Sequence, residues 1–280
     1  METHLKKQLI ITFIVFLILV LLSFLIYSFW FKVKPSCFDG IQNQDEEGID
    51  CGGICSSIKI CEPLKSIEVN FVDYVKVKDG IYDVVARIKN PNQNHGLEEL
   101  GYEFNLYGQN QEVLASRFGK TFIMPREEKY IIEANITTED TVSGTDFNFT
   151  DFNLNNPDQN NWQKLHDYNT GFGVDIVDTK FGKNPTDGTS YFRASGLIQN
   201  NTLFDLDKVV VSIVLFDRNH TIIGLNKTEA NTIKSGEKRF FVADWFDPID
   251  GDMVYWEMRA ETNFLSDENF IKQYGETQKF

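Results

Sequence analysis

The chain has 280 residues and carries 27 Lys and Arg against 41 Asp and Glu, a formal net charge of −14. Such an acidic chain repels the phosphates of nucleic acids, and no basic cluster offsets that repulsion, so we expect no nucleic-acid partner. The length exceeds that of one small β-domain and suits a short anchor followed by two domains of about 100 residues each.

The first predicted element is an apolar segment at residues 9–31, which contains no charged residue. As a helix it would be about 34 Å long, enough to cross a hydrocarbon core of about 30 Å. Tyr27 and Trp30 lie where interfacial aromatic residues are common. A cleaved signal peptide is the alternative, but its apolar region is usually about 7–15 residues long and ends at small residues. We therefore expect a transmembrane helix at residues 9–31, preceded by a short tail at residues 1–8.

All the cysteines of the chain follow this segment closely, at Cys37, Cys51, Cys55 and Cys61. Lysines flank the apolar segment on both sides, so the positive-inside rule does not orient it. An even, clustered set of cysteines is typical of disulfides in an oxidising compartment. We expect a disulfide-stapled stalk module at residues 32–63, with three pairings open. The chain would then be a single-pass protein of the cell membrane, its N-terminus cytoplasmic and its ectodomain outside.

The alternative staple for this module is zinc. The gaps of 13, 3 and 5 residues between the cysteines lack the Cys-x2-Cys pair common in zinc sites, which favours disulfides. The run from Cys37 to Cys55, with Cys61 beyond it, resembles short acidic Cys-rich modules of bacterial and archaeal cell-surface proteins. That resemblance implies no defined activity.

Calcium is a cofactor that the acidic residues of the module could bind. Carboxylate and amide oxygens are clustered between the first two cysteines, at Asp39, Asn43, Asp45, Glu47 and Asp50, and hard oxygen ligands suit Ca²⁺. The segment is not an EF-hand, because Ile41 and Gln44 stand where an oxygen ligand and a glycine are required. A small calcium loop and a solvated acidic loop both remain open.

From Leu64 onward, apolar and polar residues alternate with period two, which predicts a mainly β chain of antiparallel strands. In the first half, strands are expected at residues 67–74, 81–89, 100–107, 112–118, 130–136 and 145–154. In the second half, they are expected at residues 174–180, 191–199, 209–216, 221–227, 239–246 and 253–262. Asp79-Gly80 and Gly108-Gln109-Asn110 predict turns between strands.

The two halves form an internal repeat, offset by 211 − 102 = 109 residues. Tyr102 to Tyr107 aligns with Val211 to Phe216, Val113-Leu114 with Ile222-Ile223, Glu128-Lys129 with Glu237-Lys238, and Phe147 with Trp256. Since the matched positions are mostly apolar, the repeat predicts a duplicated core and not a duplicated catalytic centre. The opposite face of the aligned strand carries Glu103 and Asn105 in the first copy but Ser212 and Val214 in the second, so we expect the copies to use their outer surfaces differently.

A family resemblance rests on Ser195 to Asn200, Val211 to Asp217, Ile223-Gly224 and Ser235 to Phe240. These segments resemble the FxLYD domain family. Its strand motif is similar to Phe104-Asn105-Leu106-Tyr107-Gly108, with Gly108 in place of Asp, and to Ile213-Val214-Leu215-Phe216-Asp217, with Ile213 and Phe216 substituted. The resemblance implies two tandem immunoglobulin- or fibronectin-like β-sandwiches, similar to late embryogenesis abundant β-domains, at residues 64–166 and 167–280. It implies extracytoplasmic placement and no catalytic residues.

Catalytic signatures are missing from the sequence. The histidines His4, His95, His166 and His220 have no paired metal spacing, and no nucleophile elbow or phosphate loop is present. Asp244 and Asp247 flank Trp245 as a glycosidase pair would, but acids are so frequent here that we take the pairing as chance. We therefore expect no enzyme.

Aromatic residues gather near the end of each copy, at Phe147, Phe149, Phe152 and Trp162, and at Trp245, Phe246, Tyr255 and Trp256. Exposed rings of this kind can bind sugars or a partner protein, but the aligned positions of Phe147 and Trp256 favour a place in the core. We expect a non-catalytic spacer and docking platform for envelope or surface proteins, held to the membrane by residues 9–31. The alternative is an adhesin or receptor that binds glycan or a calcium-dependent ligand at the sandwich tips.

Overall fold

The protein is seen in a computed structural model that describes residues 12–23, 36–39, 46, 48, 50–55, 64–154, 160–165, 173–183 and 191–271. It divides into two compact units, Met1–Pro63 and Leu64–Phe280, which are described separately.

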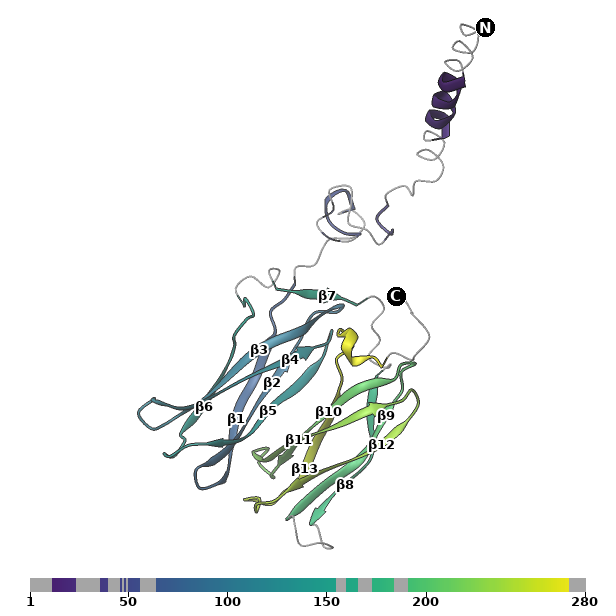
Figure 1. Ribbon diagram of the computed structural model, residues 1–280. Helices are drawn as coiled ribbons and strands as arrows, with labels where there is room; N and C mark the ends of the chain where they lie inside the picture. Colours follow the sequence, from purple (N-terminus) through teal and green to yellow (C-terminus); the bar gives the residue numbers. More distant parts are fainter. Residues whose placement is uncertain are drawn as a thin grey trace, which may run out of the picture. The chain divides into compact units, whose positions relative to one another are not determined.

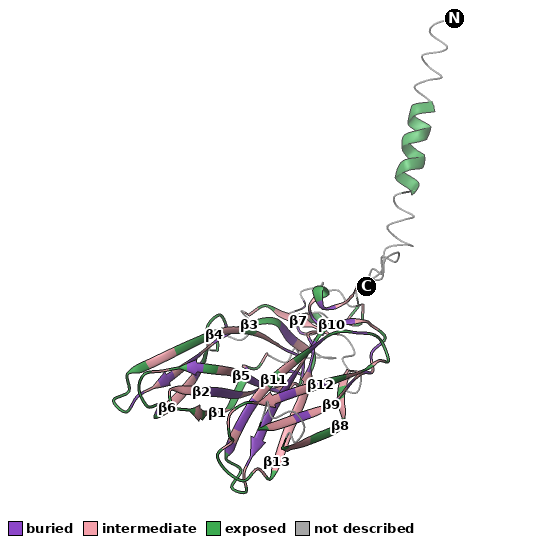
Figure 2. Cartoon of the chain, turned by 60° about the horizontal axis from the view of Figure 1, so that its bottom comes forward, coloured by how far each residue is buried: buried purple, intermediate pink, exposed green. Residues whose placement is uncertain are grey.

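The first unit begins with a helix at residues 12–23, within the predicted apolar segment. Its large side chains are exposed on every side, from Phe13 at 64% to Leu22 at 49%, and the helix is coloured as exposed throughout in Figure 2. Among the described residues, no helix has both the length and the apolar character needed to cross a membrane. The rest of the predicted 9–31 helix lies outside the described residues.

The second unit consists of antiparallel sheets arranged as two sheet pairs (Figure 1). In the first pair, one sheet has the order β1-β2-β5 and the other β4-β3-β6, with β7 added beside β3. The strands are β1 (Glu68–Lys78), β2 (Ile81–Lys89), β3 (His95–Tyr107), β4 (Val113–Ile123), β5 (Glu128–Thr137), β6 (Gly144–Phe149) and β7 (Trp162–Lys164).

The second sheet pair repeats this topology. Its sheets have the orders β12-β9-β8 and β11-β10-β13, which correspond to β5-β2-β1 and β4-β3-β6. The strands are β8 (Val174–Lys183), β9 (Phe192–Asn200), β10 (Leu206–Phe216), β11 (Ile222–Ile233), β12 (Lys238–Trp245) and β13 (Tyr255–Glu261), and a short 3-10 helix, η4 (Asp267–Asn269), follows.

Each sheet pair encloses its own apolar cluster, and the parity of the strands decides which residues enter it. Tyr102, Phe104 and Leu106 of β3 are buried in the first cluster, as are Val211, Ile213 and Leu215 of β10 in the second. The predicted common face of these two strands is therefore confirmed. Gly119 lies opposite Tyr102, and a Cβ on it would stand 2.3 Å from the tyrosine hydroxyl, so the large ring requires this glycine.

The expected strands are all present, and the residue 81–89 strand has the predicted bounds. Some extend beyond the prediction, because pairing continues after the apolar alternation stops: β4 reaches Ile123 where residue 118 was expected. The strand expected at residues 145–154 is shorter, since β6 ends at Phe149. The three-residue strand β7 was not predicted, and it extends β3 by pairing with residues from His95 onward. Gly80, at the predicted Asp79-Gly80 turn, has φ of 72°.

Two details of the predicted repeat alignment are wrong. Cross-strand pairing places Phe147 opposite Phe104, whereas Trp256 lies opposite Leu215, so the two aromatic residues differ by two positions along their strands. The β5 copy is offset by 110 and not by 109, because β11 has one residue more than β4 before the turn: Thr121 corresponds to Ala230, but Ile123 corresponds to Ile233. The turn itself is the same in both copies, with Arg126 at φ of 59° and Gly236 at φ of 73°.

A buried asparagine occupies the same place in both copies and was not identified as a structural residue from the sequence. The Nδ2 atom of Asn90 donates to the carbonyls of His95 and Met124, and the Nδ2 atom of Asn200 donates to the carbonyls of Phe204 and Ile233. Both residues are fully buried. Each amide side chain ties the end of the central strand to the loop after it and to the turn before β5 or β12, which fixes the register of the hairpin.

Candidate functional sites in the cysteine module and at the seam between the sheet pairs

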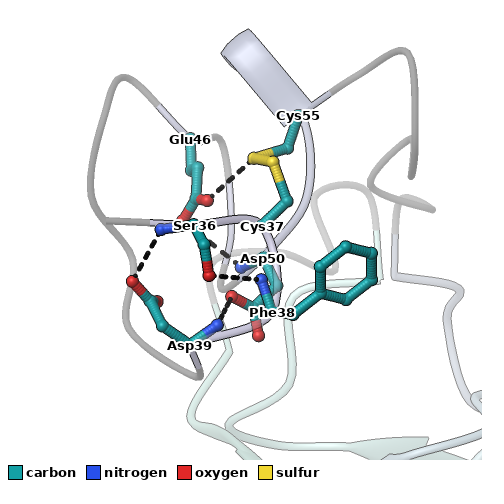
Figure 3. The surroundings of a disulfide bond; sticks show 7 residues. All are labelled: Ser36, Cys37, Phe38, Asp39, Glu46, Asp50 and Cys55. Atoms are coloured by element: carbon teal, nitrogen blue, oxygen red, sulfur yellow. Dashed lines mark hydrogen bonds between the residues drawn. A yellow bond between two sulfur atoms is a disulfide. The ribbon is translucent and has the colours of Figure 1, made fainter. Parts of the chain in front are cut away.

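The cysteine module contains a disulfide between Cys37 and Cys55, with the Cα atoms 5.6 Å apart (Figure 3). Cys51 is also disulfide-bonded, and Cys61 lies outside the described residues. The expected disulfide staple is therefore confirmed for Cys37 and Cys55. Among the described residues, the module has only one short helical element, η2 (Gly53–Cys55), which is why it depends on covalent bonds for its shape.

The candidate calcium ligands that can be placed are Asp39 and Asp50, and both bind loop backbone (Figure 3). The Oδ2 atom of Asp39 accepts a hydrogen bond from the Ser36 amide at 2.9 Å, and the Oδ1 atom of Asp50 accepts one from the Asp39 amide at 3.0 Å. Asn43, Asp45 and Glu47 lie outside the described residues. The two aspartates brace the loop in the manner of capping side chains, a role that leaves both the calcium and the solvated-loop interpretations open.

Glu46 was not among the predicted site residues, yet it is the most buried of the acids of the module that the structure describes, at 7% exposed. Its Oε2 atom accepts a hydrogen bond from the Asp50 amide, and its Oε1 atom lies 3.0 Å from the Sγ atom of Cys55. Cys37, Glu46 and Cys55 bring two sulfurs and a carboxylate within 4.8 Å of one another. Because a metal binds the thiolate form and these sulfurs are joined in a disulfide, the group is not a metal site in this state.

The larger candidate site is the seam between the two sheet pairs, where a third apolar cluster lies. Its buried members come from β2 and β5 of the first pair and from the β10-β11 hairpin of the second: Val85, Tyr130, Ile132, Val214, Phe216, Ile222 and Leu225. Phe216 stacks on Tyr255, with ring centroids 4.6 Å apart. The sheets β1-β2-β5 and β11-β10-β13 therefore have apolar residues on both faces, and the second unit is a stack of four sheets with a cluster in each interval.

The seam also contains a buried ion pair between the two sheet pairs. The Nζ atom of Lys129 on β5 lies 2.8 Å from the Oε2 atom of Glu261 on β13, and the two side chains are 2% and 6% exposed. The lysine also lies over the ring of Phe122, 3.7 Å from its centroid. Burial raises the pKa of Glu261 to about 7, although the charge of Lys129 opposes that rise. The other carboxylate oxygen, Oε1, has no hydrogen-bond partner among the described residues.

Tyr130 anchors the neighbouring part of the seam. Its hydroxyl donates to Glu257 on β13 at 2.7 Å, and the guanidinium carbons of Arg87 and Arg259 lie 5.6 and 5.5 Å from the centroid of its ring. Arg259 in turn donates to the carbonyl of Glu128 at 2.7 Å. Cation–π contacts and a hydroxyl hydrogen bond orient an aromatic ring, and through Glu257 and Arg259 of β13 these contacts of Tyr130 join the two sheet pairs.

Further polar contacts flank the seam. Lys227 donates to the carbonyl of Ile132 at 2.8 Å, and Lys78 forms an ion pair with Asp247 at 2.9 Å. A cleft of about 640 Å³ runs beside the ion pair and is lined by both sheet pairs. Its described lining mixes lysines with carboxylates, so it shows no preference for a ligand of one charge.

Asp244 and Asp247 line the same cleft of about 230 Å³, but each is bound to a cation. Asp244 forms a bidentate ion pair with Arg193, and Asp247 pairs with Lys78. The Nδ1 atom of His220 lies 2.8 Å from the hydroxyl of Tyr255. His95 is a half-buried residue of β3, and His4 and His166 lie outside the described residues.

The aromatic residues near the end of each copy mostly pack in the cores. Phe147 and Phe152 are buried in the first cluster, with Phe149 and Trp162 against it, while Trp245 and Trp256 pack against the second. Tyr255 belongs to the seam, and Phe246 is 65% exposed. The core interpretation of these residues holds for all of them except the last two.

No protein-family model matches the chain, and no curated protein matches it. The seam was not predicted from sequence as a site. Its one signal was the polarity difference between Asn105 and Val214, which occupy equivalent outward positions on β3 and β10.

Proposed function

We propose that this protein is a single-pass, membrane-anchored and non-catalytic surface protein, whose tandem β-sandwiches form a rigid spacer and docking platform for envelope proteins. Each sheet pair would be one sandwich of the immunoglobulin- or fibronectin-like kind that the FxLYD resemblance implies. The observation that carries the proposal is the seam, because a cluster of buried apolar residues and a buried ion pair favour one fixed geometry over a hinge.

The anchor is supported by the segment at residues 9–31. Its described part is a helix that exposes apolar side chains all round, and a helix of this kind is stable where its surroundings are apolar too. The disulfide between Cys37 and Cys55 supports an oxidising compartment for the part of the chain that follows. Both observations favour an ectodomain outside the cell.

The adhesin alternative has less support. It needs aromatic residues exposed near loops, but Trp162, Trp245 and Trp256 contact the two apolar clusters, which leaves Phe246 as the strongly exposed member of the group. Calcium at the cysteine module would belong to the stalk and not to a sandwich tip.

The experiment is labelling of intact cells with a membrane-impermeant amine crosslinker, followed by mass spectrometry. We expect Lys120, which is 68% exposed, to react, and Lys129, which is 2% exposed, to remain unmodified. Recurrent crosslinks to a few envelope proteins would support the docking role. Labelling without crosslinks to other proteins would move the preference to the adhesin, and protection of Lys120 in intact but not in lysed cells would refute the outside placement.

A further inference from the structure

The outward face of the sheet β12-β9-β8 carries an apolar row whose members are exposed or half-buried. Phe240 on β12 lies opposite Leu197 on β9, which lies opposite Val177 on β8. Their strand neighbours Phe241, Ile198 and Ile176 contact the second core cluster, so the row faces away from it. Phe240 is 61% exposed. Figure 1 shows this sheet on the side of the second unit away from the first sheet pair.

The internal repeat relates this row to the seam. The equivalent row of the first sheet pair is Phe71, Arg87 and Tyr130, paired across β1, β2 and β5. In the first copy this face is covered by the sheet β11-β10-β13, with Tyr130 as the anchor. Phe240 occupies the position of Tyr130, so the second copy presents an aromatic residue where the first copy docks a sheet.

Head-to-tail addition of a second chain does not fit this surface. The face that would repeat the seam belongs to the sheet β4-β3-β6 of another copy, and its outward positions include Glu103, Asn105 and Asp146, where β10 has Ser212 and Val214. An acidic, hydrogen-bonded face is a poor partner for Phe240 and Leu197, because its carboxylates would be desolvated without compensation.

The row is instead complementary to itself. Next to it runs a second row, in which Lys238 on β12 and Asp175 on β8 lie on either side of Gln199. Rotation by 180° about an axis parallel to β9 places β12 of one chain over β8 of the other. Lys238 then faces Asp175 of the partner twice, Phe240 faces Val177, and Leu197 faces its own copy. An axis across the strands would place Lys238 over Val242 and lose this match.

We propose that the sheet β12-β9-β8 is a homodimer surface, closed by this two-fold axis. Such an interface is isologous, with an apolar centre and an oppositely charged pair at each side. A rotation about the strand direction leaves the Leu64 ends of both second units at the same end of the dimer, as two chains in one membrane require. The dimer goes beyond the proposed function, because a monomeric chain could also act as a spacer.

The test is the molar mass of the full chain in mild detergent, measured by light scattering after size-exclusion chromatography. We expect a dimer for the natural chain. Phe240→Asp should raise the dimer dissociation constant by at least about 100-fold, since the two-fold axis buries the change twice. The matched control is Phe118→Asp on β4, where the phenylalanine is 65% exposed on the polar face, and it should leave the dimer unchanged.

Charge reversal tests the axis itself. Lys238→Asp should dissociate the dimer, and the double change Lys238→Asp with Asp175→Lys should restore it. Leu197→Cys should form a disulfide-linked dimer in the membrane on oxidation. A natural chain that stays monomeric would overturn the proposal, as would a dimer that survives both Phe240→Asp and Lys238→Asp, or one that Leu197→Cys does not crosslink.

Discussion

Replacing Lys129 by Met would test the buried ion pair at the seam. The change leaves Glu261 94% buried without its cation, whereas the apolar methionine still fills the space over Phe122. Removing one partner of a buried pair costs about 3–5 kcal/mol, because the remaining charge is uncompensated. We expect the free energy of unfolding to fall by about 3 kcal/mol at pH 8.5.

The loss should depend on pH with a defined sign. The folded-state pKa of Glu261 is raised from 4.5 to about 7, so the ionised carboxyl disfavours the folded state at high pH, and this penalty diminishes as the pH falls from 7 toward 4.5. Without the charge of Lys129, the folded-state pKa of Glu261 rises further, so the carboxyl of Glu261 takes up a proton when the chain folds. One pH unit corresponds to about 1.4 kcal/mol. The difference in the free energy of unfolding between the variant and the natural chain should therefore shrink to about 1 kcal/mol at pH 7.

The assay is urea unfolding of the full chain in mild detergent, followed by tryptophan fluorescence at both pH values. Lys120→Met is the matched control, since Lys120 pairs with Glu99 at an exposed site and should change stability by less than about 0.5 kcal/mol. The double variant Lys129→Met with Glu261→Leu should regain most of the loss. Equal effects of the two single lysine variants, or a loss that does not change with pH, would refute the role of this pair.

Three further results are expected from the same unfolding assay. Val214→Asn gives the second copy the residue of the first, and it should lower the free energy of unfolding by about 2 kcal/mol because it places an amide in the seam. The control Asn105→Val, on the outward face of β3, should change the stability little. Equal effects would mean that the seam does not bury Val214. Asn200→Ala should cost about 3 kcal/mol, because it leaves buried backbone groups of the β9 hairpin unpaired, and a loss below 1 kcal/mol would contradict this. Burial raises the pKa of Asp83 to about 6, so its ionised carboxyl disfavours folding above pH 6 and ceases to do so toward pH 4. Asp83→Asn should therefore stabilise the chain by about 1–2 kcal/mol at pH 8 and hardly at pH 4. A gain that is equal at both pH values would be inconsistent with the raised pKa.

The strands could be predicted from sequence because alternation records which side of a strand meets a core. β2 kept its predicted bounds, since its apolar run ends at Asn90, whose side chain closes the hairpin. β7 could not be predicted, as three residues contain too little alternation to identify a strand, and only its pairing with β3 holds it.

The alignment of the repeat was informative in the middle of the copies and failed at the ends. Register within β3 and β10 is fixed by a buried face, so the residues aligned there are equivalent. One extra residue between Ala230 and Ile233 of β11, relative to Thr121 and Ile123 of β4, shifts the offset to 110. An extra residue within a strand changes the pairing with the neighbouring strand, which the pattern of apolar residues does not record.

The cysteines, the acids between them and the apolar segment at residues 9–31 could all be identified from sequence, because composition and spacing alone define them. That Cys37 pairs with Cys55 required coordinates, since four cysteines allow three pairings. The acids Asp39 and Asp50 could be named but not assigned, because a carboxylate can brace a loop or bind an ion and only its neighbours distinguish the two roles.

By itself, then, the sequence determined that the chain after Leu64 is mainly β, duplicated and acidic, because these properties follow from local alternation, self-similarity and composition. Only the tertiary structure decided that the outward face of β10 meets β2 and β5, that Lys129 and Glu261 meet inside the seam, and that Phe240 stays uncovered. The physical reason is that a strand pattern distinguishes apolar from polar faces but does not say which apolar face packs against which. That choice depends on contacts between residues more than 100 positions apart, such as Tyr130 and Glu257.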